Sequence, residues 1–236
     1  MKEFDYEVDG NRFQSPVFVV ADALPVELID EVMKKYPLET FEEGQHMQPK
    51  EQQDPESDTK YGVNKDMRKS KVLFLEDEVL DKFIFVHMQM ANWHLGLRYE
   101  ITGAEQTQLT AYEGKTTGGG HYDWHTDGPS DHYCERVPVF GKTCDLNQIN
   151  QPHLAGTVRK ISCSIILNDD FEGGDFQVRY LKYGDTQNLC IDQIDTFKPV
   201  KGNAIFFTSN LFHRVTPVTK GTRYSLVKWF AGPPLK

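Results

Sequence analysis

The C-terminal half of the chain contains a series of short apolar segments separated by turn-forming residues, and this series limits the fold more than any other feature. The expected strands are residues 106–112, 121–126, 160–167, 175–180, 204–208, 211–216 and 222–230. Two segments with helical spacing of apolar residues precede them, between Asp22 and Pro37 and at 77–97. Helices followed by many short strands favour helices packed on an antiparallel sandwich or barrel. We therefore expect a mainly β fold with flanking helices (α+β).

The length of the chain, 236 residues, fits one domain. We expect residues 1–236 to form that domain, with residues 1–100 as a helical buttress and residues 101–236 as the β core. Residues 42–66 are rich in Glu, Gln, Lys, Asp and Pro and nearly free of aliphatic side chains, which predicts a long mobile loop. Such a loop is either a lid or binding loop, or a solvated insertion.

The net charge is -9 and the isoelectric point is about 5.4, so the sequence shows no basic surface for a nucleic-acid backbone, and we expect no nucleic-acid partner. The N-terminus lacks the features of a signal peptide, and no apolar run reaches membrane-spanning length. The cysteines fit no zinc motif and are interpreted as reduced thiols. We expect a soluble cytoplasmic protein without membrane contact. The cysteines are Cys134, Cys144, Cys163 and Cys190.

Potential metal ligands alternate along residues 121–127, where His121, Asp123, His125 and Asp127 occupy every second position. Alternate residues of a strand share one face, so four donor side chains are expected on the same face. A His-x-Asp pair places a nitrogen donor beside an oxygen donor, which suits a divalent metal. We favour His125 and Asp127, because the Gly-Pro that follows ends the strand at the rim. The pair His121 and Asp123 is an alternative, with contact to substrate as a further role.

A third ligand candidate is His213, between two apolar strands, and Arg223 follows it by ten residues. The turn-forming residues between them predict a hairpin centred near Val218, which would place the two side chains nearly opposite each other. A buried guanidinium needs an anion, and a carboxylate is its natural partner. Two histidines and one carboxylate on a β scaffold are the facial triad of non-haem Fe(II) oxygenases, and the arginine indicates a dicarboxylate such as 2-oxoglutarate.

Residues 106–230 resemble the Fe(II)/2-oxoglutarate-dependent dioxygenases of the prolyl 4-hydroxylase-like group. The resemblance is carried by Leu-Thr-Ala-Tyr-Glu-Gly at 109–114, by Trp-His-Thr-Asp at 124–127, by the strand pair with its Gly-Gly turn at 159–176, and by residues 202–226. The resemblance implies a double-stranded β-helix (jelly-roll) core within residues 101–236. The N-terminal helices would buttress that core.

The same resemblance implies roles for individual residues. It implies His125, Asp127 and His213 as iron ligands, and it implies Arg223 as the clamp on the distal carboxylate of 2-oxoglutarate. Tyr112 matches the tyrosine that hydrogen-bonds the co-substrate, and Ser225 shares the strand face of Arg223. The implied cofactors are Fe(II), 2-oxoglutarate as co-substrate and O₂. Ascorbate is a further candidate.

The function that follows is hydroxylation of an unactivated C–H bond, of a peptidyl residue such as proline. The partner would then be a peptide or protein substrate. A hydroxylase of a free amino acid or small metabolite, with the same iron site, is an alternative. A non-catalytic jelly-roll binding protein is a different class of alternative, and a nucleic-acid demethylase is disfavoured by the acidic charge.

Overall fold

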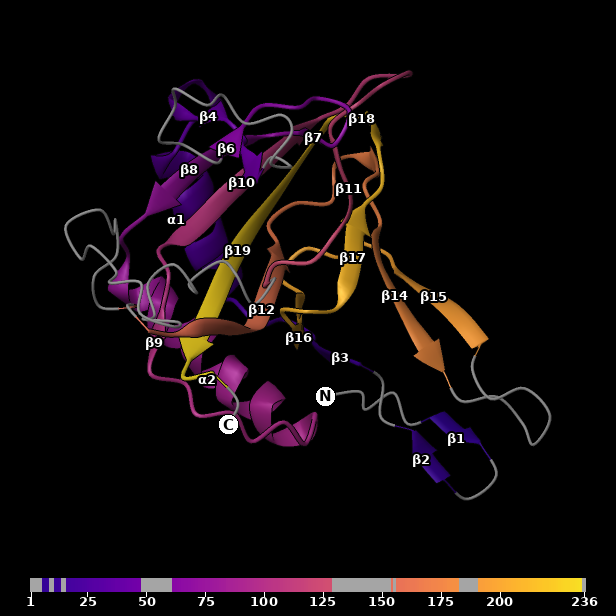
Figure 1. Ribbon diagram of the computed structural model, residues 1–236. Coiled ribbons are helices and arrows are strands. Elements are labelled where there is room, and N and C mark those ends of the chain that lie inside the picture. The colour runs from indigo at the N-terminus through magenta and orange to yellow at the C-terminus, as the bar shows by residue number, and fades with distance from the viewer. Residues whose placement is uncertain are drawn as a thin grey trace, which may run out of the picture.

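The computed structural model describes residues 6–8, 11–13, 16–47, 61–128, 154, 156–182 and 191–234 (Figure 1). Two antiparallel sheets face each other, and two helices cover the far side of the larger one (Figure 1). Part of the predicted loop, residues 48–60, and three of the four cysteines lie outside the described residues. These cysteines are Cys134, Cys144 and Cys190.

The larger sheet combines strands from both halves of the chain. Its order is β3-β16-β12-β19-β10-β8-β4, with β9 on the end of β19, and neighbouring strands are antiparallel. The strands are β3 (Val17–Val20), β4 (Glu42–Glu43), β8 (Lys71–Leu75), β9 (Gly103–Ala104), β10 (Thr107–Glu113), β12 (Val158–Ile166), β16 (Ala204–Thr208) and β19 (Thr222–Gly232).

The smaller sheet has the order β15-β14-β17-β11-β7, again with antiparallel neighbours. Its strands are β7 (Arg68–Lys69), β11 (His121–His125), β14 (Phe176–Lys182), β15 (Ile191–Phe197) and β17 (Phe212–Val215). Three further pairs form outside the two sheets, and a short 3₁₀ helix, η1, spans Leu38–Thr40. The pairs are β1 (Tyr6–Val8) with β2 (Asn11–Phe13), β5 (His46–Met47) with β6 (Tyr61–Gly62), and β13 (Glu172–Gly173) with β18 (Val218–Lys220).

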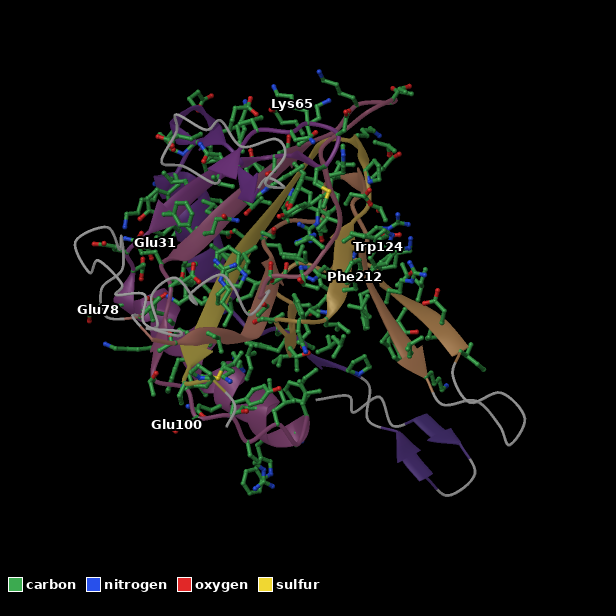
Figure 2. All side chains as sticks on the ribbon, viewed as in Figure 1. Glu31, Lys65, Glu78, Glu100, Trp124 and Phe212 are labelled. Atoms are coloured by element: carbon green, nitrogen blue, oxygen red, sulfur yellow. The ribbon has the colours of Figure 1, made fainter. Side chains whose placement is uncertain are left out.

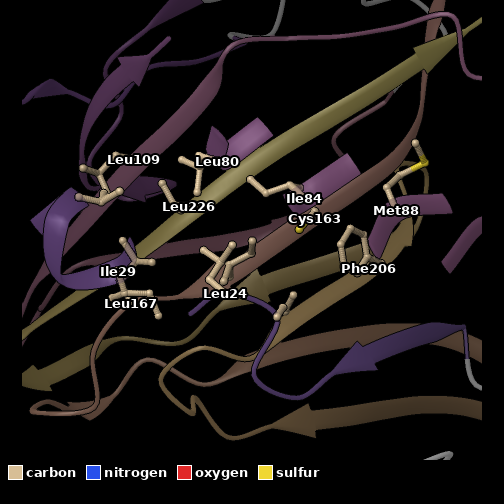
Figure 3. Packing of buried hydrophobic residues seen from close by; sticks show 14 of the residues in the cluster. Leu24, Ile29, Leu80, Ile84, Met88, Leu109, Cys163, Leu167, Phe206 and Leu226 are labelled. Atoms are coloured by element: carbon tan, nitrogen blue, oxygen red, sulfur yellow. The ribbon is translucent and has the colours of Figure 1, made fainter. Parts of the chain in front are cut away.

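The helices α1 (Val26–Lys35) and α2 (Glu78–His94) bury one face against the larger sheet. On α2 the buried side chains recur every four residues, at Leu80, Ile84 and Met88, as a helix packed on one side requires. Figure 3 shows them beside strand residues such as Cys163 and Leu226. Each fully buried aliphatic side chain of this size contributes about 1.5–3 kcal/mol to folding, so this layer is a main source of stability.

The opposite face of the larger sheet lines the interior between the two sheets. On β16, Phe206 packs under the helices, whereas its neighbours Ile205 and Phe207 join a second apolar cluster. That cluster also contains Phe176 and Val178 of the smaller sheet. Because side chains alternate along each strand, the two faces of the larger sheet contribute to two different apolar clusters. Residues of the inner face pack against side chains from the smaller sheet.

The predicted mainly β fold with flanking helices is confirmed, and two facing antiparallel sheets of this kind form a jelly roll. The first hundred residues supply strands as well as helices, because β3, β4, β7 and β8 join the two sheets. Helix α1 begins after Pro25, three residues beyond Asp22, where the predicted helical segment begins. Within the predicted loop 42–66, the described ends form β4, β5 and β6. The single domain over residues 1–236 stays a prediction.

None of the helices in the described part of the chain is both long and apolar enough to cross a bilayer.

The predicted start of the second helix allows a test of the fold. Asp77 is the N-cap of α2, and its carboxylate accepts hydrogen bonds from the backbone N–H groups of Val79 and Leu80 at 3.1 and 3.0 Å. Asp77→Ala is expected to lower the free energy of unfolding by about 1 kcal/mol, a melting-temperature decrease of about 2–4 °C in a chain of this size. Thermal denaturation measures this, with Asp169→Ala, an exposed turn carboxylate, as the matched control.

Candidate active site

Two histidines and an aspartate converge on the inner side of the smaller sheet. His125 ends β11 and is the direct cross-strand partner of His213 on β17, so the two imidazoles are neighbours. Asp127 follows β11 by two residues and lies 3.7 Å from Nε2 of His125 and 3.5 Å from Nε2 of His213. One ligand atom from each residue lies within 4.8 Å of the others. We call these three residues the three-donor cluster.

Backbone hydrogen bonds orient both imidazoles toward the cluster. Nδ1–H of His125 donates to the carbonyl of Asp123 at 2.6 Å, and Nδ1–H of His213 donates to the carbonyl of Leu211 at 2.9 Å. A proton held on Nδ1 leaves the lone pair on Nε2, which is the nitrogen that faces Asp127. The backbone therefore fixes the tautomer that a metal requires.

Burial and mutual charge set the protonation of the cluster. Burial and the neighbouring His213 lower the pKa of His125 to about 3. Burial alone would raise the pKa of Asp127, but His213, His125 and Arg159 outweigh it and lower that pKa to about 2. Near neutral pH the cluster thus presents a neutral imidazole at His125 and a carboxylate at Asp127.

This donor set fits a divalent cation such as Fe(II). Two nitrogens and one carboxylate with open positions opposite are the arrangement of non-haem iron oxygenases. Ligands about 2.1 Å from one ion and at right angles to each other lie about 3 Å apart. The observed separations of 3.5 and 3.7 Å are slightly longer, so small side-chain rotations would complete the site.

In the same interior, Arg223 of β19 is a buried cation that forms no ion pair within the part of the chain that the structure describes. Its side chain is 1% exposed, and Nη1 donates to Oγ of Ser225 at 2.8 Å. Its other two nitrogens, Nε and Nη2, are buried and have no hydrogen-bond partner among the described residues. Burial lowers the pKa of Arg223 to about 10. Because unpaired buried donors are costly, this guanidinium is arranged to receive a ligand with acceptor oxygens.

Tyr112 of β10 completes this corner of the interior. It is the direct cross-strand partner of Arg223, and its ring centre lies 5.4 Å from the guanidinium carbon. Burial raises the pKa of Tyr112, so its hydroxyl stays protonated and can donate a hydrogen bond. The structure thus brings together Tyr112, Arg223 and Ser225, the predicted co-substrate residues.

Comparison with known proteins identifies the family. Residues 107–231, more than half of the chain, match the family described as the 2OG-Fe(II) oxygenase superfamily. The chain belongs to this superfamily. The predictions of a dioxygenase and of Fe(II), 2-oxoglutarate and O₂ as its cofactors are thereby confirmed. The assignment of individual side chains to iron and to 2-oxoglutarate stays a prediction. No curated protein matches the sequence of this oxygenase.

Solved structures of prolyl hydroxylases share the fold. A Pseudomonas putida prolyl-4-hydroxylase has a TM-score of 0.57 at 16% identity, over 93% of this chain and 94% of that chain. A Trichoplax adhaerens prolyl hydroxylase, in complex with a hypoxia inducible factor peptide fragment, has a TM-score of 0.55 at 16% identity, over 91% and 83%. The viral collagen prolyl hydroxylase of Paramecium Bursaria Chlorella virus-1, in a 2OG complex, has a TM-score of 0.54 at 14% identity, over 92% and 97%.

The predicted hairpin between His213 and Arg223 is wrong. In the oxygenase β17 pairs with β14 and β11, whereas β19 pairs with β10 and β12 in the other sheet. The intervening β18 pairs with β13 instead of forming a turn. The chain crosses from one sheet to the other between these residues, so both side chains are buried, but they approach the interior from different sheets.

The expectation of four donors on one strand face is also wrong. The register of β11 against β17 shifts between Tyr122 and His125, which breaks the alternation, and the ring of Tyr122 stacks on His125 at 3.5 Å. The side chain of Asp123 is 52% exposed, 3.9 Å from Arg214. Both ring nitrogens of His121 lie within 3.0 Å of backbone carbonyls, so neither is available to the cluster. The alternative ligand pair is therefore not assembled.

The register shift in β11 leaves Trp124 on the outer face of the smaller sheet. Trp124 stacks near Phe212, and the two lie side by side on that face (Figure 2). Arg214 lies over the ring of Trp124 and donates to the side chain of Gln177 at 2.7 Å. Arg214 thus faces away from its neighbour His213, as strand parity predicts.

Arg159 holds the segment that contains Asp127, a role that the sequence did not reveal. Its Nη1 donates to the carbonyl of Asp127 at 2.8 Å, and its other nitrogens form a two-point ion pair with Glu105. The backbone N–H of Asp127 also donates to the carbonyl of Ser209 at 2.9 Å. Such supports keep a ligand in place when the metal leaves. Arg159 is the second residue of β12, but nothing in its local sequence distinguishes it from a surface arginine.

The low pKa of His125 predicts how the metal-free oxygenase responds to acid. The unfolded chain protonates this imidazole below its ordinary pKa of 6.5, whereas the folded chain resists protonation down to about pH 3. Protons therefore favour the unfolded state in this window, and the free energy of unfolding is expected to fall as the pH is lowered from 6.5 toward 3. Urea denaturation of wild type and His125→Gln measures this. The variant should show a smaller slope, and equal slopes would contradict the pKa assignment.

Proposed function

We propose that this oxygenase hydroxylates an unactivated C–H bond of a peptidyl residue such as proline. The observation that carries the co-substrate assignment is Arg223, a buried guanidinium with two unpaired nitrogens in the interior that the three-donor cluster borders. A dicarboxylate that reaches from the cluster to Arg223 satisfies both ends of this arrangement. 2-Oxoglutarate carries a carboxylate at each end, and the family match names it.

The proposed roles follow from position. His125, Asp127 and His213 hold Fe(II) through Nε2 and carboxylate oxygens. Bound there, iron would supply the activation of O₂ that couples oxidation of 2-oxoglutarate to C–H hydroxylation. Arg223 clamps the distal carboxylate of 2-oxoglutarate, and Tyr112 adds a hydroxyl donor.

The remaining contribution of the chain is orientation and exclusion of water. Ser225 accepts from Nη1 of Arg223, which fixes the plane of the guanidinium. Phe176 and Phe207 pack around His213, with ring centres 5.6 and 4.6 Å from the imidazole. This apolar wall lowers the local dielectric, so charge–charge contacts between the chain and 2-oxoglutarate are stronger than in water.

The proposal of a peptidyl substrate rests on the shared fold. Three solved structures that share it are prolyl hydroxylases, and one of them holds a peptide fragment. Because their identities to this chain are 14–16%, the fold supports the substrate class and not a particular peptide. The free amino acid or small-metabolite hydroxylase is the competing outcome of the experiment below.

The test is a screen of the purified protein with Fe(II) and 2-oxoglutarate, with and without ascorbate, against proline-containing peptides and free amino acids. Succinate release and a product mass gain of one oxygen atom are the readouts. We expect Fe(II)-dependent succinate release that a peptide stimulates. Stimulation by free amino acids alone would contradict the peptidyl assignment, and no binding of 2-oxoglutarate in the presence of metal would contradict the whole proposal.

A further inference from the structure

A second arginine, Arg68, faces the interior one aromatic ring away from the three-donor cluster. Arg68 of β7 is the direct cross-strand partner of Tyr122, and opposed residues project on the same face of a sheet. Its guanidinium carbon lies 4.8 Å from the centre of the Tyr122 ring, which in turn stacks on the ring of His125 at 3.5 Å. The order from the proposed metal outward is therefore imidazole, phenol, guanidinium.

Arg68 is buried, and no described residue supplies a counter-charge to it. The residue is 8% exposed, and its two bonded nitrogens donate to neutral groups, Oγ of Ser70 and the carbonyl of Gln45, both at 2.8 Å. No carboxylate of the described residues forms an ion pair with it. Asp127 is directed to the two histidines, and Glu105 pairs with Arg159. Buried guanidinium groups are rarely left without an anion, so a ligand is the natural source of one.

The guanidinium of Arg68 is held in a fixed orientation. The chain passes directly over it at Gly44, where a Cβ atom would lie 2.4 Å from Oγ of Ser70 and 2.9 Å from Nε of Arg68. The bonds run from Nε and Nη1, so among the described residues the terminal nitrogen Nη2 has no acceptor and its N–H groups are open to a ligand. A preorganised cation of this kind binds an anion without the entropy loss of ordering a flexible side chain.

The charge of Arg68 also reaches the active site. Burial raises the pKa of Tyr112, and Arg68 and Arg223 both act in the opposite direction. Burial likewise raises the pKa of Tyr122 to about 12, against the effect of Arg68. Two cations thus act on the same interior. Only Arg223, which bonds Ser225 on the larger sheet, is assigned to the co-substrate.

We infer that Arg68 binds a carboxylate of the substrate, so that the preferred substrates are acids whose reacting C–H bond lies a few bonds from that carboxylate. The inference rests on the proposed function, because it takes Arg223 as the site for 2-oxoglutarate. The carboxylate belongs either to a peptide, as its C-terminus or an acidic side chain, or to a free amino acid. In each case bidentate hydrogen bonds from the planar guanidinium would fix the distance between the acid group and the metal.

The test measures binding without turnover. The protein is loaded with Fe(II) and 2-oxoglutarate in the absence of O₂ and then titrated with matched pairs that differ only in charge. The pairs are N-acetyl amino acids against their primary amides, and free amino acids against their amides. Thermal stabilisation reports binding, since a ligand of the folded state raises the melting temperature. The variants are Arg68→Gln, Arg68→Lys and the control Lys69→Gln, which removes a charge from the same strand on its other face.

We expect the wild type and Lys69→Gln to bind acids at least about tenfold more tightly than amides. Arg68→Gln should lose this preference, and Arg68→Lys should keep part of it. If N-acetyl amino acids bind most tightly, the carboxylate belongs to a peptide. If free amino acids bind most tightly, the substrate is a free amino acid. Equal binding of acids and amides, binding of neither at millimolar concentration, or an unchanged preference in Arg68→Gln would overturn the inference.

Stabilisation by 2-oxoglutarate in the same samples separates the two proposals. If 2-oxoglutarate stabilises the wild type and Arg68→Gln alike, the variant is folded and the co-substrate site is intact, so any failure concerns Arg68 alone. If 2-oxoglutarate does not stabilise the metal-loaded wild type, the proposed function itself fails.

Discussion

Replacement of His213 by alanine is expected to abolish iron-dependent turnover and to reduce metal affinity by more than about a hundredfold. Even residues that only orient a metal ligand are worth about 10–100-fold in affinity or activity, so loss of a direct ligand costs more. His213 is 4% exposed and packs between Phe176 and Phe207, so alanine also removes the imidazole that fills this position. Metal content after dialysis and succinate release are the measurements.

The control for this prediction is His121→Ala, because His121 belongs to the other His-x-Asp pair. Its ring nitrogens contact the carbonyls of Gly119 and Asp66 rather than the three-donor cluster. We expect this variant to bind iron as the wild type does. Loss of iron from His121→Ala with retention by His213→Ala would reverse the ligand assignment. Circular dichroism of both variants separates lost metal binding from lost folding.

The residues of the three-donor cluster could be proposed as ligands from the sequence because their chemistry is local. His125 and Asp127 sit two positions apart, and a strand followed by Gly-Pro places such a pair at a rim whatever the rest of the chain does. The structure brings His125 and Asp127 together with His213 and leaves His121 and Asp123 outside this cluster, although the four donors do not share one face as strict alternation predicts. The assignment of the cluster to iron stays a prediction. The register shift after Tyr122 depends on how β11 fits against β17, and single-sequence periodicity carries no information about that fit.

Strand pairing was predictable only in part. Residues 211–216 and 222–230 are strands as expected, but ten residues between His213 and Arg223 suggested a hairpin where the chain crosses between sheets. A jelly roll joins consecutive strands across its two sheets, so closeness in sequence does not imply pairing. The two side chains lie in the same interior for a reason that differs from the predicted one.

The roles of two other arginines near the cluster, Arg68 and Arg159, could not be predicted from the sequence. Arg68 lies in a two-residue strand beyond the charged segment, and Arg159 lies far from Glu105 in sequence. Their roles depend on contacts between distant segments, such as the pairing of β7 with β11 and the meeting of β12 with the residues before β10. No periodicity or motif marks such contacts. Only the folded structure shows that Arg159 holds the backbone of Asp127 and that Arg68 is buried without an ion pair among the described residues.

Replacement of Arg223 by methionine is expected to raise the Michaelis constant for 2-oxoglutarate by about thirtyfold or more, with turnover at saturating 2-oxoglutarate less affected. Loss of one partner of a buried, hydrogen-bonded charge pair costs about 2–5 kcal/mol, and each 1.4 kcal/mol is a factor of ten in affinity. Methionine has similar length and no donors, so the interior stays filled. Initial rates over a range of 2-oxoglutarate concentrations measure the effect, and Arg214→Met on the outer sheet face is the control.

The same substitution is expected to change stability in the opposite sense. In the protein without ligand, Nε and Nη2 of Arg223 are buried and unpaired, so the folded state carries their desolvation cost. Methionine removes that cost, and Arg223→Met should melt at a higher temperature than the wild type when no 2-oxoglutarate is present. Added 2-oxoglutarate with metal should then stabilise the wild type strongly and the variant little. A variant that melts lower without ligand, or that 2-oxoglutarate stabilises as much as the wild type, would show that Arg223 is a structural residue. The expected result is that Arg223→Met melts higher than the wild type without 2-oxoglutarate and gains less when 2-oxoglutarate and metal are added. This result would show that the interior keeps a destabilising cation because the co-substrate neutralises it.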